Sequence, residues 1–308
     1  MRRFAPLSAL AFVAACVAPS GEYRAPDTES VEVVQPVEAS VRPTVPTSAP
    51  APAPAGPSTF LYSGELTQGG WIRGQVPAGT LSAQLGDKPL ALADDGHFFA
   101  AFDRDAGASA TLSATLRDGR TIESPLTISP RAWQIENINA SPTANVPSAE
   151  FTARRRPELE RIAASRQVET GSDGWRQSFR WPVTGRISGR FGSQRVYRGE
   201  PGSYHSGIDV AGGNGTPYVA PADGVVVLAA ESPFTLEGYL LIVDHGMGLS
   251  SAFLHSSALL VREGEAVKQG QVLGRIGATG RATGPHMHWG LMWRGQRLDP
   301  LLFTGPMP

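Results

Sequence analysis

The chain has 308 residues, with 27 lysines and arginines against 28 aspartates and glutamates, and its formal net charge is −1. This balance excludes a nucleic acid as a partner bound mainly through charge, because such proteins carry a net basic field. Hydrophobic residues, at 41%, suffice for a packed core, while 35 glycines and 26 prolines leave little room for long helices. We therefore expect an all-β protein with one or two folded units.

The N-terminus has the features of an export signal. A basic start (residues 1–3) precedes an apolar run (4–15) that is too short to span a membrane, so residues 1–15 are predicted to be a signal peptide. Residues 13–16, Val-Ala-Ala-Cys, resemble the lipobox of bacterial lipoproteins, in which the cysteine, here Cys16, is acylated. The alternative is a plain secretory signal cut elsewhere, with Cys16 discarded.

The residues after Cys16 indicate where the protein would be anchored and how far it would reach. Val17 follows the cysteine, and by resemblance to Gram-negative lipoproteins this favours the periplasmic side of the outer membrane. Nine of the 26 prolines lie between Pro19 and Pro57. Such a stretch cannot bury enough apolar surface to offset its ordering entropy, so residues 16–57 are predicted to be a disordered tether.

Residues 58–130 are predicted to form a small β-sandwich accessory domain. Short apolar-alternating runs are separated by turn signals, of which Asp95-Gly96 and Asp118-Gly119 are typical of tight hairpins. The expected strands cover residues 60–66, 71–76, 81–85, 98–102, 110–116 and 121–128. Because this region shows no cluster of metal-ligating residues, we interpret it as a spacer or binding module, with His97 as a surface histidine.

A connector and a second β domain follow. Residues 131–180 are predicted to be a connector with a short helix, because Pro157 suits a first helical position and residues 158–166 are strong helix formers. From residue 181 to 308 short strands return, expected at residues 185–191, 224–230, 240–244, 250–255, 272–276 and 286–293. This C-terminal domain holds most of the histidines, so we expect the chemistry there.

Two short motifs in the C-terminal domain predict a metal site. His205 and Asp209 are four residues apart, and His286 and His288 are two apart. Positions i, i+2 and i+4 of an extended strand project to one face. If both segments are extended, His205, Asp209 and a histidine from 286–288 converge on one ion. Two histidines, one carboxylate and an open fourth position form the ligand set of a catalytic zinc site, whereas structural sites usually recruit cysteines.

Two further histidines lie between the motifs. His255 ends the run Phe253-Leu254-His255, and its presence in the same β domain strengthens the prediction of a metal site. His245, in the run Val243-Asp244-His245-Gly246, is interpreted as a residue at the tip of a hairpin without a role in the chemistry.

Four segments carry a family resemblance. Residues 204–209 (YHSGID), 220–224 (APADG), 251–255 (SAFLH) and 277–288 (GATGRATGPHMH) resemble the LytM/lysostaphin family of zinc metallopeptidases, over about residues 181–303. The resemblance implies an antiparallel β-sandwich or half-barrel with a groove. It also implies one zinc ion per chain, bound by His205, Asp209 and His288, with His255 and His286 as catalytic histidines. The upstream β domain and connector are similar to those of alphaproteobacterial cell-wall peptidases.

The implied function is a zinc endopeptidase that hydrolyses peptide cross-links of bacterial peptidoglycan with a zinc-activated water. The alternative is a non-enzymatic regulator of the same family that activates cell-wall amidases. Such regulators typically lack some of the metal ligands, and every ligand position is filled here. A Gram-negative cell would offer the D-Ala to diaminopimelate cross-bridge as the target, although a glycine bridge is not excluded. Cell-wall or division proteins are further expected partners.

Overall fold

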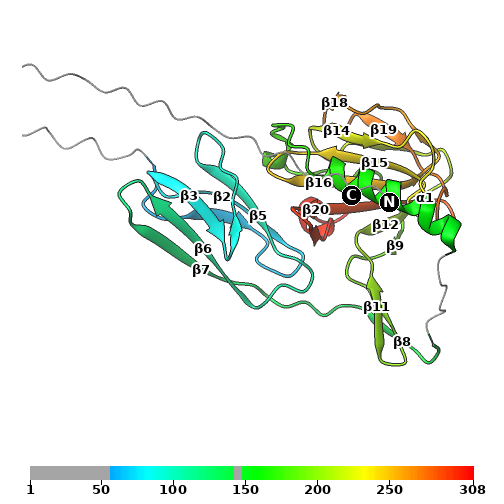
Figure 1. The fold of residues 1–308 in the computed structure, drawn as a ribbon, viewed down its shortest axis with the longest axis horizontal. Coiled ribbons are helices and arrows are strands. Elements are labelled where there is room, and N and C mark those ends of the chain that lie inside the picture. Colours follow the sequence, from blue (N-terminus) through cyan, green and yellow to red (C-terminus); the bar gives the residue numbers. More distant parts are fainter. Residues whose placement is uncertain (1–55, 142–147) are drawn as a thin grey trace, which may run out of the picture. The chain divides into compact units, whose positions relative to one another are not determined.

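The computed structural model describes residues 56–141 and 148–308, which lie in a compact unit spanning Pro52–Pro308 (Figure 1). The predicted signal peptide, the lipidation of Cys16 and nearly all of the predicted tether fall outside the described residues. Within the described part of the chain, the structure contains no helix with the length and apolar character that a membrane span requires. Strands dominate, and the prediction of an all-β fold is confirmed.

Residues 58–130, here called the N-terminal lobe, form two antiparallel sheets. The first has the order β1 (Leu61–Gly64), β2 (Trp71–Gln75) and β5 (His97–Ala101). The second has the order β4 (Lys88–Pro89), β3 (Thr80–Leu85), β6 (Ser109–Leu116) and β7 (Thr121–Thr127). Ile72, Phe98 and Leu112 are fully buried in this lobe. The predicted hairpin at Asp118-Gly119 forms between β6 and β7. The predicted hairpin at Asp95-Gly96 is wrong, because this tight turn lies between β4 and β5, which belong to different sheets. Gly96 and Gly119 both adopt a positive φ.

A large antiparallel sheet dominates the C-terminal half (Figure 1). Its strand order is β18 (Ala266–Val267), β14 (Gly224–Ala229), β15 (Tyr239–Asp244), β16 (Leu249–Ser256), β20 (His286–Trp293), β12 (Ile208–Ala211) and β9 (Ile187–Gly189), with β21 (Gln296–Leu298) also paired to β20. A small sheet contains β13 (Pro217–Val219), β19 (Val272–Arg275) and β17 (Ala258–Leu259). The predicted strands all occur, with ends shifted by a few residues.

One face of the large sheet packs into the main core, and strand alternation decides which residues lie on that face and which lie on the other. Phe253, Met287 and Trp289 are buried in that core. Leu254, Ala252 and Leu240 lie in a second apolar cluster. Since Leu254 is paired in register with His288, this second cluster shares its sheet face with the histidines of β20.

The connector contributes one strand and one long helix. Strand β8 (Ile135–Ile138) pairs in parallel with β10 (Gln194–Tyr197), which forms a hairpin with β11 (Glu200–Tyr204). Helix α1 (Ala149–Ser165) packs through Ile162 onto the second apolar cluster, so it covers part of the face that carries His288. A one-turn 3₁₀ helix (Gly174–Arg176) precedes the large sheet, and the short helix α2 (Leu301–Thr304) follows it.

The predicted start of the connector helix is wrong. We expected Pro157 at the first helical position, but α1 begins eight residues earlier, at Ala149, and Pro157 lies inside it. The Ser148 hydroxyl caps the helix by accepting a hydrogen bond of 3.0 Å from the backbone N–H of Phe151. Tertiary contacts also hold the first half, because the Arg155 guanidinium donates to both carboxylate oxygens of Glu237. These interactions offset the backbone hydrogen bond that Pro157 cannot make.

Candidate metal centre

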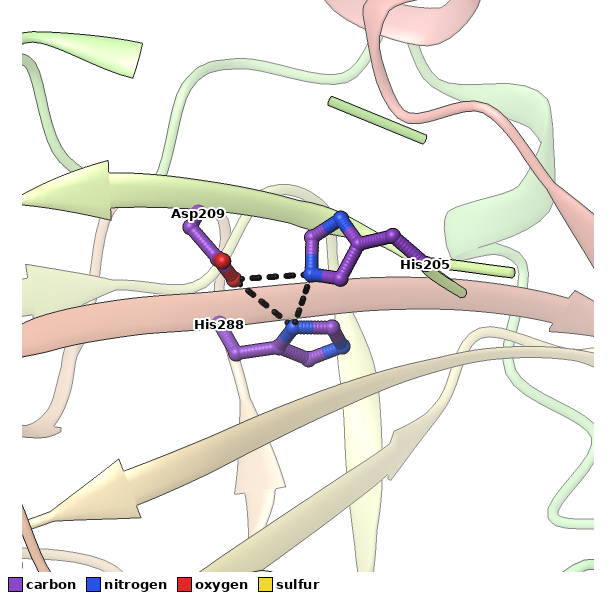
Figure 2. Close-up of side chains that lie close together, drawn as sticks. All are labelled: His205, Asp209 and His288. Atoms are coloured by element: carbon purple, nitrogen blue, oxygen red, sulfur yellow. Dashed lines mark hydrogen bonds and ion pairs between the residues drawn. The ribbon is translucent and has the colours of Figure 1, made fainter. Parts of the chain in front are cut away.

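Three side chains with metal-ligating atoms meet on the face of the large sheet. His205 Nε2, Asp209 Oδ1 and His288 Nδ1 point toward one another (Figure 2). Asp209 Oδ1 lies 2.8 Å from His288 Nδ1, and each of these atoms lies 3.1 Å from His205 Nε2. The sequence motif therefore predicted a cluster that the fold assembles, and of the two histidines at 286 and 288 it is His288 that joins it.

Sheet register places two of the three side chains. Asp209 on β12 is the direct antiparallel partner of His288 on β20, so both side chains project from the same face at adjacent points. His205 reaches the cluster differently. It follows β11 and lies outside any strand, and residues 205–207 connect β11 to β12. The condition that His205 and Asp209 lie in one extended strand is therefore not met, because a bend at Gly207 separates them.

The β10–β11 hairpin and the loop before it hold His205 in place. The backbone N–H of His205 donates to the Ser193 carbonyl at 2.8 Å, and the N–H of Gly192 donates to the His205 carbonyl at 2.9 Å. The ring Nδ1 lies 3.1 Å from the Arg190 carbonyl oxygen. Because a carbonyl only accepts, Nδ1 carries the proton, and the lone pair on Nε2 is directed at the cluster.

The electrostatics of the cluster suit a cation. Burial would raise the pKa of Asp209, but hydrogen bonds from His205 and His288 outweigh it and hold the pKa well below its usual range. Burial lowers the pKa of His288 despite the neighbouring carboxylate. Burial would lower the pKa of His205, but the hydrogen bond to Asp209 outweighs this effect, and the pKa is raised. An ionised carboxylate and a largely neutral imidazole thus face the shared centre.

These three side chains fit a zinc ion. Ligand atoms at the corners of a tetrahedron around zinc, with bonds of about 2.0–2.1 Å, are roughly 3.3 Å apart. The observed separations of 2.8–3.1 Å are close to that value. When the His205 ring is neutral and protonated on Nδ1, its Nε2 faces Asp209 Oδ1 at 3.1 Å with lone pair toward lone pair. A proton on Nε2, which the raised pKa of His205 favours, or a bound cation stabilises this contact.

Two glycines that sequence reasoning missed make room for the cluster. A Cβ built at Gly189 on β9 would collide with Asp209 Oδ2 and lie 3.1 Å from His205 Cε1. A Cβ at Gly207 would lie 2.8 Å from His288 Nε2. Neither glycine has a positive φ, so the constraint is space and not backbone conformation. Gly207 lies in the segment 204–209 that carries the family resemblance, whereas nothing in the sequence distinguishes Gly189 from the turn glycines. Only the packing gives the reason for either glycine.

His255 and His286 lie beside the cluster, and in each ring Nδ1 faces a backbone carbonyl oxygen. Their ring centroids are 5.0 Å apart. His255 Nδ1 lies 2.9 Å from the Thr279 carbonyl oxygen, and His286 Nδ1 lies 2.8 Å from that of Gly284. Nδ1 therefore carries the proton in both rings, which leaves Nε2 as the free nitrogen. His286 Nε2 lies 3.8 Å from Asp209 Oδ1.

The surroundings of His255 distinguish it from an ordinary strand residue. Its φ is +65°, a left-handed conformation that is costly for a residue with a side chain. Burial lowers the pKa of His255, which favours a neutral ring. The alternation predicted for residues 286–288 is confirmed, because Met287 is buried in the main core while His286 and His288 lie on the opposite face.

The two remaining histidines do not join the cluster. His97 is part-exposed on β5 beside Asp95, as expected. His245 lies in the β15–β16 hairpin, as expected, but it is fully buried. Its Nδ1 donates to the Asp223 carbonyl at 2.7 Å, and its Nε2 lies 2.8 Å from Ser251 Oγ. Its role is to anchor the hairpin to the core.

Open space lies on both sides of the cluster. A groove of about 1130 Å³ is lined by His205 and Asp209 together with residues of β9, β10 and β11. On the other side, a cavity of about 220 Å³ lies between α1 and the sheet, with His288 among its lining residues. An extended ligand can therefore approach the cluster along the first groove, and α1 restricts the second space.

Comparisons with known proteins match the segment of the chain that contains the site. Residues 203–300 match the model of Peptidase family M23. The peptidoglycan DD-endopeptidase ShyA of Vibrio cholerae is 36% identical over 146 residues, 45% of this chain and 33% of that protein. The murein hydrolase activator NlpD of Escherichia coli is 33% identical over 167 residues, 54% of this chain and 40% of that protein. The chain thus spans a third to two fifths of the length of these relatives.

The fold comparison covers more of the chain than the family model does. The crystal structure of a Pseudomonas aeruginosa protein described as an M23 peptidase aligns with a TM-score of 0.60 at 27% identity. The alignment covers 78% of this chain and 96% of that one, whereas the family model covers residues 203–300. The similarity therefore includes elements that precede the domain with the metal centre.

Proposed function

We propose, from the match of residues 203–300 to the model of Peptidase family M23, that the protein is a zinc-dependent endopeptidase that hydrolyses peptide cross-links of bacterial peptidoglycan. The observation that carries the proposal is the complete set of side chains at the metal centre. His205, Asp209 and His288 converge within hydrogen-bonding distance of one another. Three protein ligands leave a fourth position open, as catalytic zinc sites require.

Each histidine has a role that its environment supports. In this proposal His205, Asp209 and His288 hold one zinc ion, which lowers the pKa of a bound water toward about 7 and polarises a carbonyl group. His255 and His286 accept, hold or return a proton at Nε2, because a backbone carbonyl fixes the proton of each ring on Nδ1. The depressed pKa of His255 suits a base that is neutral at the start of the reaction.

The charge of the groove supports a peptide of the cell wall as the substrate. Four arginines line the groove, at positions 190, 195, 281 and 297, against Glu136 and Asp209. Glu136 is paired with Arg195. Among the described residues, Arg190, Arg281 and Arg297 have no carboxylate partner. An excess of guanidinium groups in a chain with a net charge of −1 suits the carboxylates of peptidoglycan stem peptides.

A second candidate function is the activation of cell-wall amidases. Relatives described as murein hydrolase activators match this chain at 33–34% identity over 167 residues. In addition, helix α1 covers part of the sheet face beside His288, which would restrict the access of a substrate from that side. We favour the endopeptidase because the site contains a full ligand set together with two oriented histidines.

The products formed from purified cross-linked peptidoglycan distinguish the two functions. The endopeptidase converts cross-linked peptide dimers to monomers without any other protein and creates one new amino group per cut. The activator leaves the dimers intact when alone and, with an amidase present, increases the release of peptides from the glycan. Unchanged dimers after incubation of the zinc-loaded protein would refute the endopeptidase.

For the place of action, we propose the periplasmic side of the outer membrane, with Cys16 as the lipidated residue. A related Pseudomonas aeruginosa protein is described as a lipoprotein, which supports an envelope location. The replacement Cys16→Ser is expected to abolish labelling with a radioactive fatty acid and to release the protein from the membrane fraction. A wild-type protein that carries no lipid and fractionates as the variant does would contradict the anchor.

A further inference from the structure

The N-terminal lobe sends one buried arginine toward the metal centre. Arg104 lies in the turn between β5 and β6 and is only 6% exposed. Burying a guanidinium is costly unless its donors are satisfied. Its Nη1 donates to Asp105 Oδ1 at 2.6 Å, but the remaining contacts of the guanidinium are made with the other half of the molecule. Those contacts identify what the arginine holds.

The guanidinium forms hydrogen bonds with the loop before β10. Its Nε and Nη2 both donate to the carbonyl oxygen of Gly192, at 3.1 and 3.0 Å, and Nη2 also donates to Gln194 Oε1 at 3.1 Å. Two parallel N–H donors on one carbonyl fix its direction as well as its position, which a lysine ammonium cannot do.

The same loop, residues 190–193, holds His205 in place. The Gly192 N–H donates to the His205 carbonyl at 2.9 Å, and the neighbouring Ser193 carbonyl accepts the His205 N–H at 2.8 Å. Two residues before Gly192, the carbonyl of Arg190 accepts from His205 Nδ1 and so sets the direction of Nε2. Arg104 therefore binds the same loop whose backbone holds and orients the ring of His205.

Aromatic stacking adds a second link to the same place. The Arg104 guanidinium lies over the ring of Tyr204 at 4.8 Å, and Tyr204 directly precedes His205. It also lies 5.2 Å from the ring of Trp133, which belongs to the connector. Tyr204 in turn packs on Phe191, in the loop before β10, with ring centroids 6.0 Å apart. The cation thus contacts Trp133, Gly192 of the loop before β10, and Tyr204, which precedes His205.

We infer that Arg104 is a positioning residue for the metal ligand His205, so that the N-terminal lobe completes the metal centre of the C-terminal domain. The inference rests on the proposed role of His205 as a zinc ligand and not on the reaction that the site performs. Since residues 190–205 lie at one edge of the site and outside the large sheet's central strands, their position depends on such outside contacts. Mutation of a group that hydrogen-bonds a metal ligand directly typically lowers the metal affinity by about 10–100-fold.

The test compares zinc affinity in full-length variants. Arg104→Lys keeps the charge but loses the paired donors, and Arg104→Gln keeps one donor but loses the charge. Trp71→Phe is the matched control, because it removes a different hydrogen bond between the lobe and the C-terminal half, from Trp71 Nε1 to the Leu302 carbonyl at 2.9 Å. Zinc affinity is measured by competition with a chromogenic chelator, and the thermal unfolding of the metal-free proteins is recorded beside it.

We expect both Arg104 variants to bind zinc more weakly than wild type, by up to about tenfold, because Arg104 acts one contact beyond the groups that hydrogen-bond His205 directly. Trp71→Phe should lower the unfolding temperature without changing zinc affinity. Saturating zinc should restore most of the hydrolysis rate of Arg104→Lys, since the ligands themselves remain. Wild-type zinc affinity in both Arg104 variants overturns the inference, and so does a wild-type protein that binds no zinc. Zinc binding without hydrolysis in wild type contradicts the proposed function and leaves the positioning role standing.

Discussion

The two imidazole rings of the candidate metal centre direct different nitrogen atoms toward it. His205 presents Nε2 because the Arg190 carbonyl fixes its Nδ1, whereas His288 presents Nδ1 from the floor of the sheet. His255 and His286 present Nε2 from beside the centre. The four rings therefore divide into two that share a centre with Asp209 and two that face it, and this division can be tested residue by residue.

The first prediction separates the proposed ligands His205 and Asp209 from the proposed catalytic residue His255. His205→Ala and Asp209→Ala each remove an atom of the three-atom cluster, so zinc content and hydrolysis should fall together. His255→Ala should keep the zinc and lose turnover, because its ring faces the centre without joining it. Metal analysis beside cross-link hydrolysis checks this. Loss of zinc from His255→Ala equal to that from His205→Ala would show that His255 is a ligand.

The second prediction compares neighbours on β20. His288→Ala should lose both zinc and activity, while His286→Ala should lose activity and retain most of its zinc. Met287→Leu is the matched control, because Met287 is buried on the other face and the change conserves apolar volume. Zinc content and digestion rates of the three variants decide it. An active His286→Ala protein, or a zinc-replete His288→Ala protein, would mean that the two roles are reversed.

The third prediction concerns the space behind Asp209. In Gly189→Ala the new Cβ would overlap the carboxylate and crowd His205, so the ligands must move apart and zinc affinity should fall by at least about tenfold. Gly213→Ala is the control, since its Cβ would meet only Thr216 Oγ1 at an ordinary contact distance of 3.5 Å. Equal zinc affinity in the two variants would show that the site tolerates a methyl group there.

At the scale of elements, strand alternation made most of the site predictable. The faces of His286, Met287 and His288 follow from a period of two, and the structure agrees. His205 could not be placed in this way, because it lies between strands and its ring is oriented by the Arg190 carbonyl, which no spacing encodes. The start of α1 was missed for a related reason, since the contact between Arg155 and Glu237 joins residues 82 positions apart.

The β15–β16 hairpin gives a prediction about pH. Burial lowers the pKa of His245 to about 4, and the ring is neutral in the fold, with Nδ1 donating to the Asp223 carbonyl and Nε2 facing Ser251 Oγ. In the unfolded chain the pKa is about 6.5. The unfolded state therefore binds the proton first as pH falls, and the stability that the neutral ring contributes is present above pH 6.5 and lost between about 6.5 and 4.

This pH effect should be visible in thermal unfolding. A shift of this size corresponds to at most about 3 kcal/mol of unfolding free energy. We expect the unfolding temperature of wild type to fall between pH 7 and pH 4.5 more steeply than that of His245→Gln, which keeps polar atoms at this position but cannot take up the proton. Parallel curves for the two proteins over this range would contradict the assignment.

At the scale of the whole molecule, the N-terminal lobe contacts the C-terminal half at several places, among them one aromatic contact and one hydrogen-bonded contact. At the first, Trp71 and Phe99 of the lobe pack against Phe303 of α2, with ring centroids 5.2 and 6.3 Å apart. At the second, Arg104 binds the loop that carries His205. Sequence patterns predicted the strands of each half but not these two contact sites. Contacts between residues some 90 to 230 positions apart leave no local signal in the sequence.

The accompanying fold match extends this view. The Pseudomonas aeruginosa structure aligns over 78% of the chain, more than residues 203–300 alone could supply. If Arg104 positions His205 as we infer, the part of the chain in which the site is studied has to include the lobe as well as residues 203–300.

The most direct test of the central claim is a titration of the metal-free, full-length protein with zinc while the hydrolysis of cross-linked peptide dimers is followed. We predict no hydrolysis without zinc, a linear rise in rate as zinc is added, and a plateau at one zinc per chain, because His205, Asp209 and His288 form one centre. Hydrolysis by the metal-free protein, or intact dimers after one zinc per chain has bound, would contradict the account.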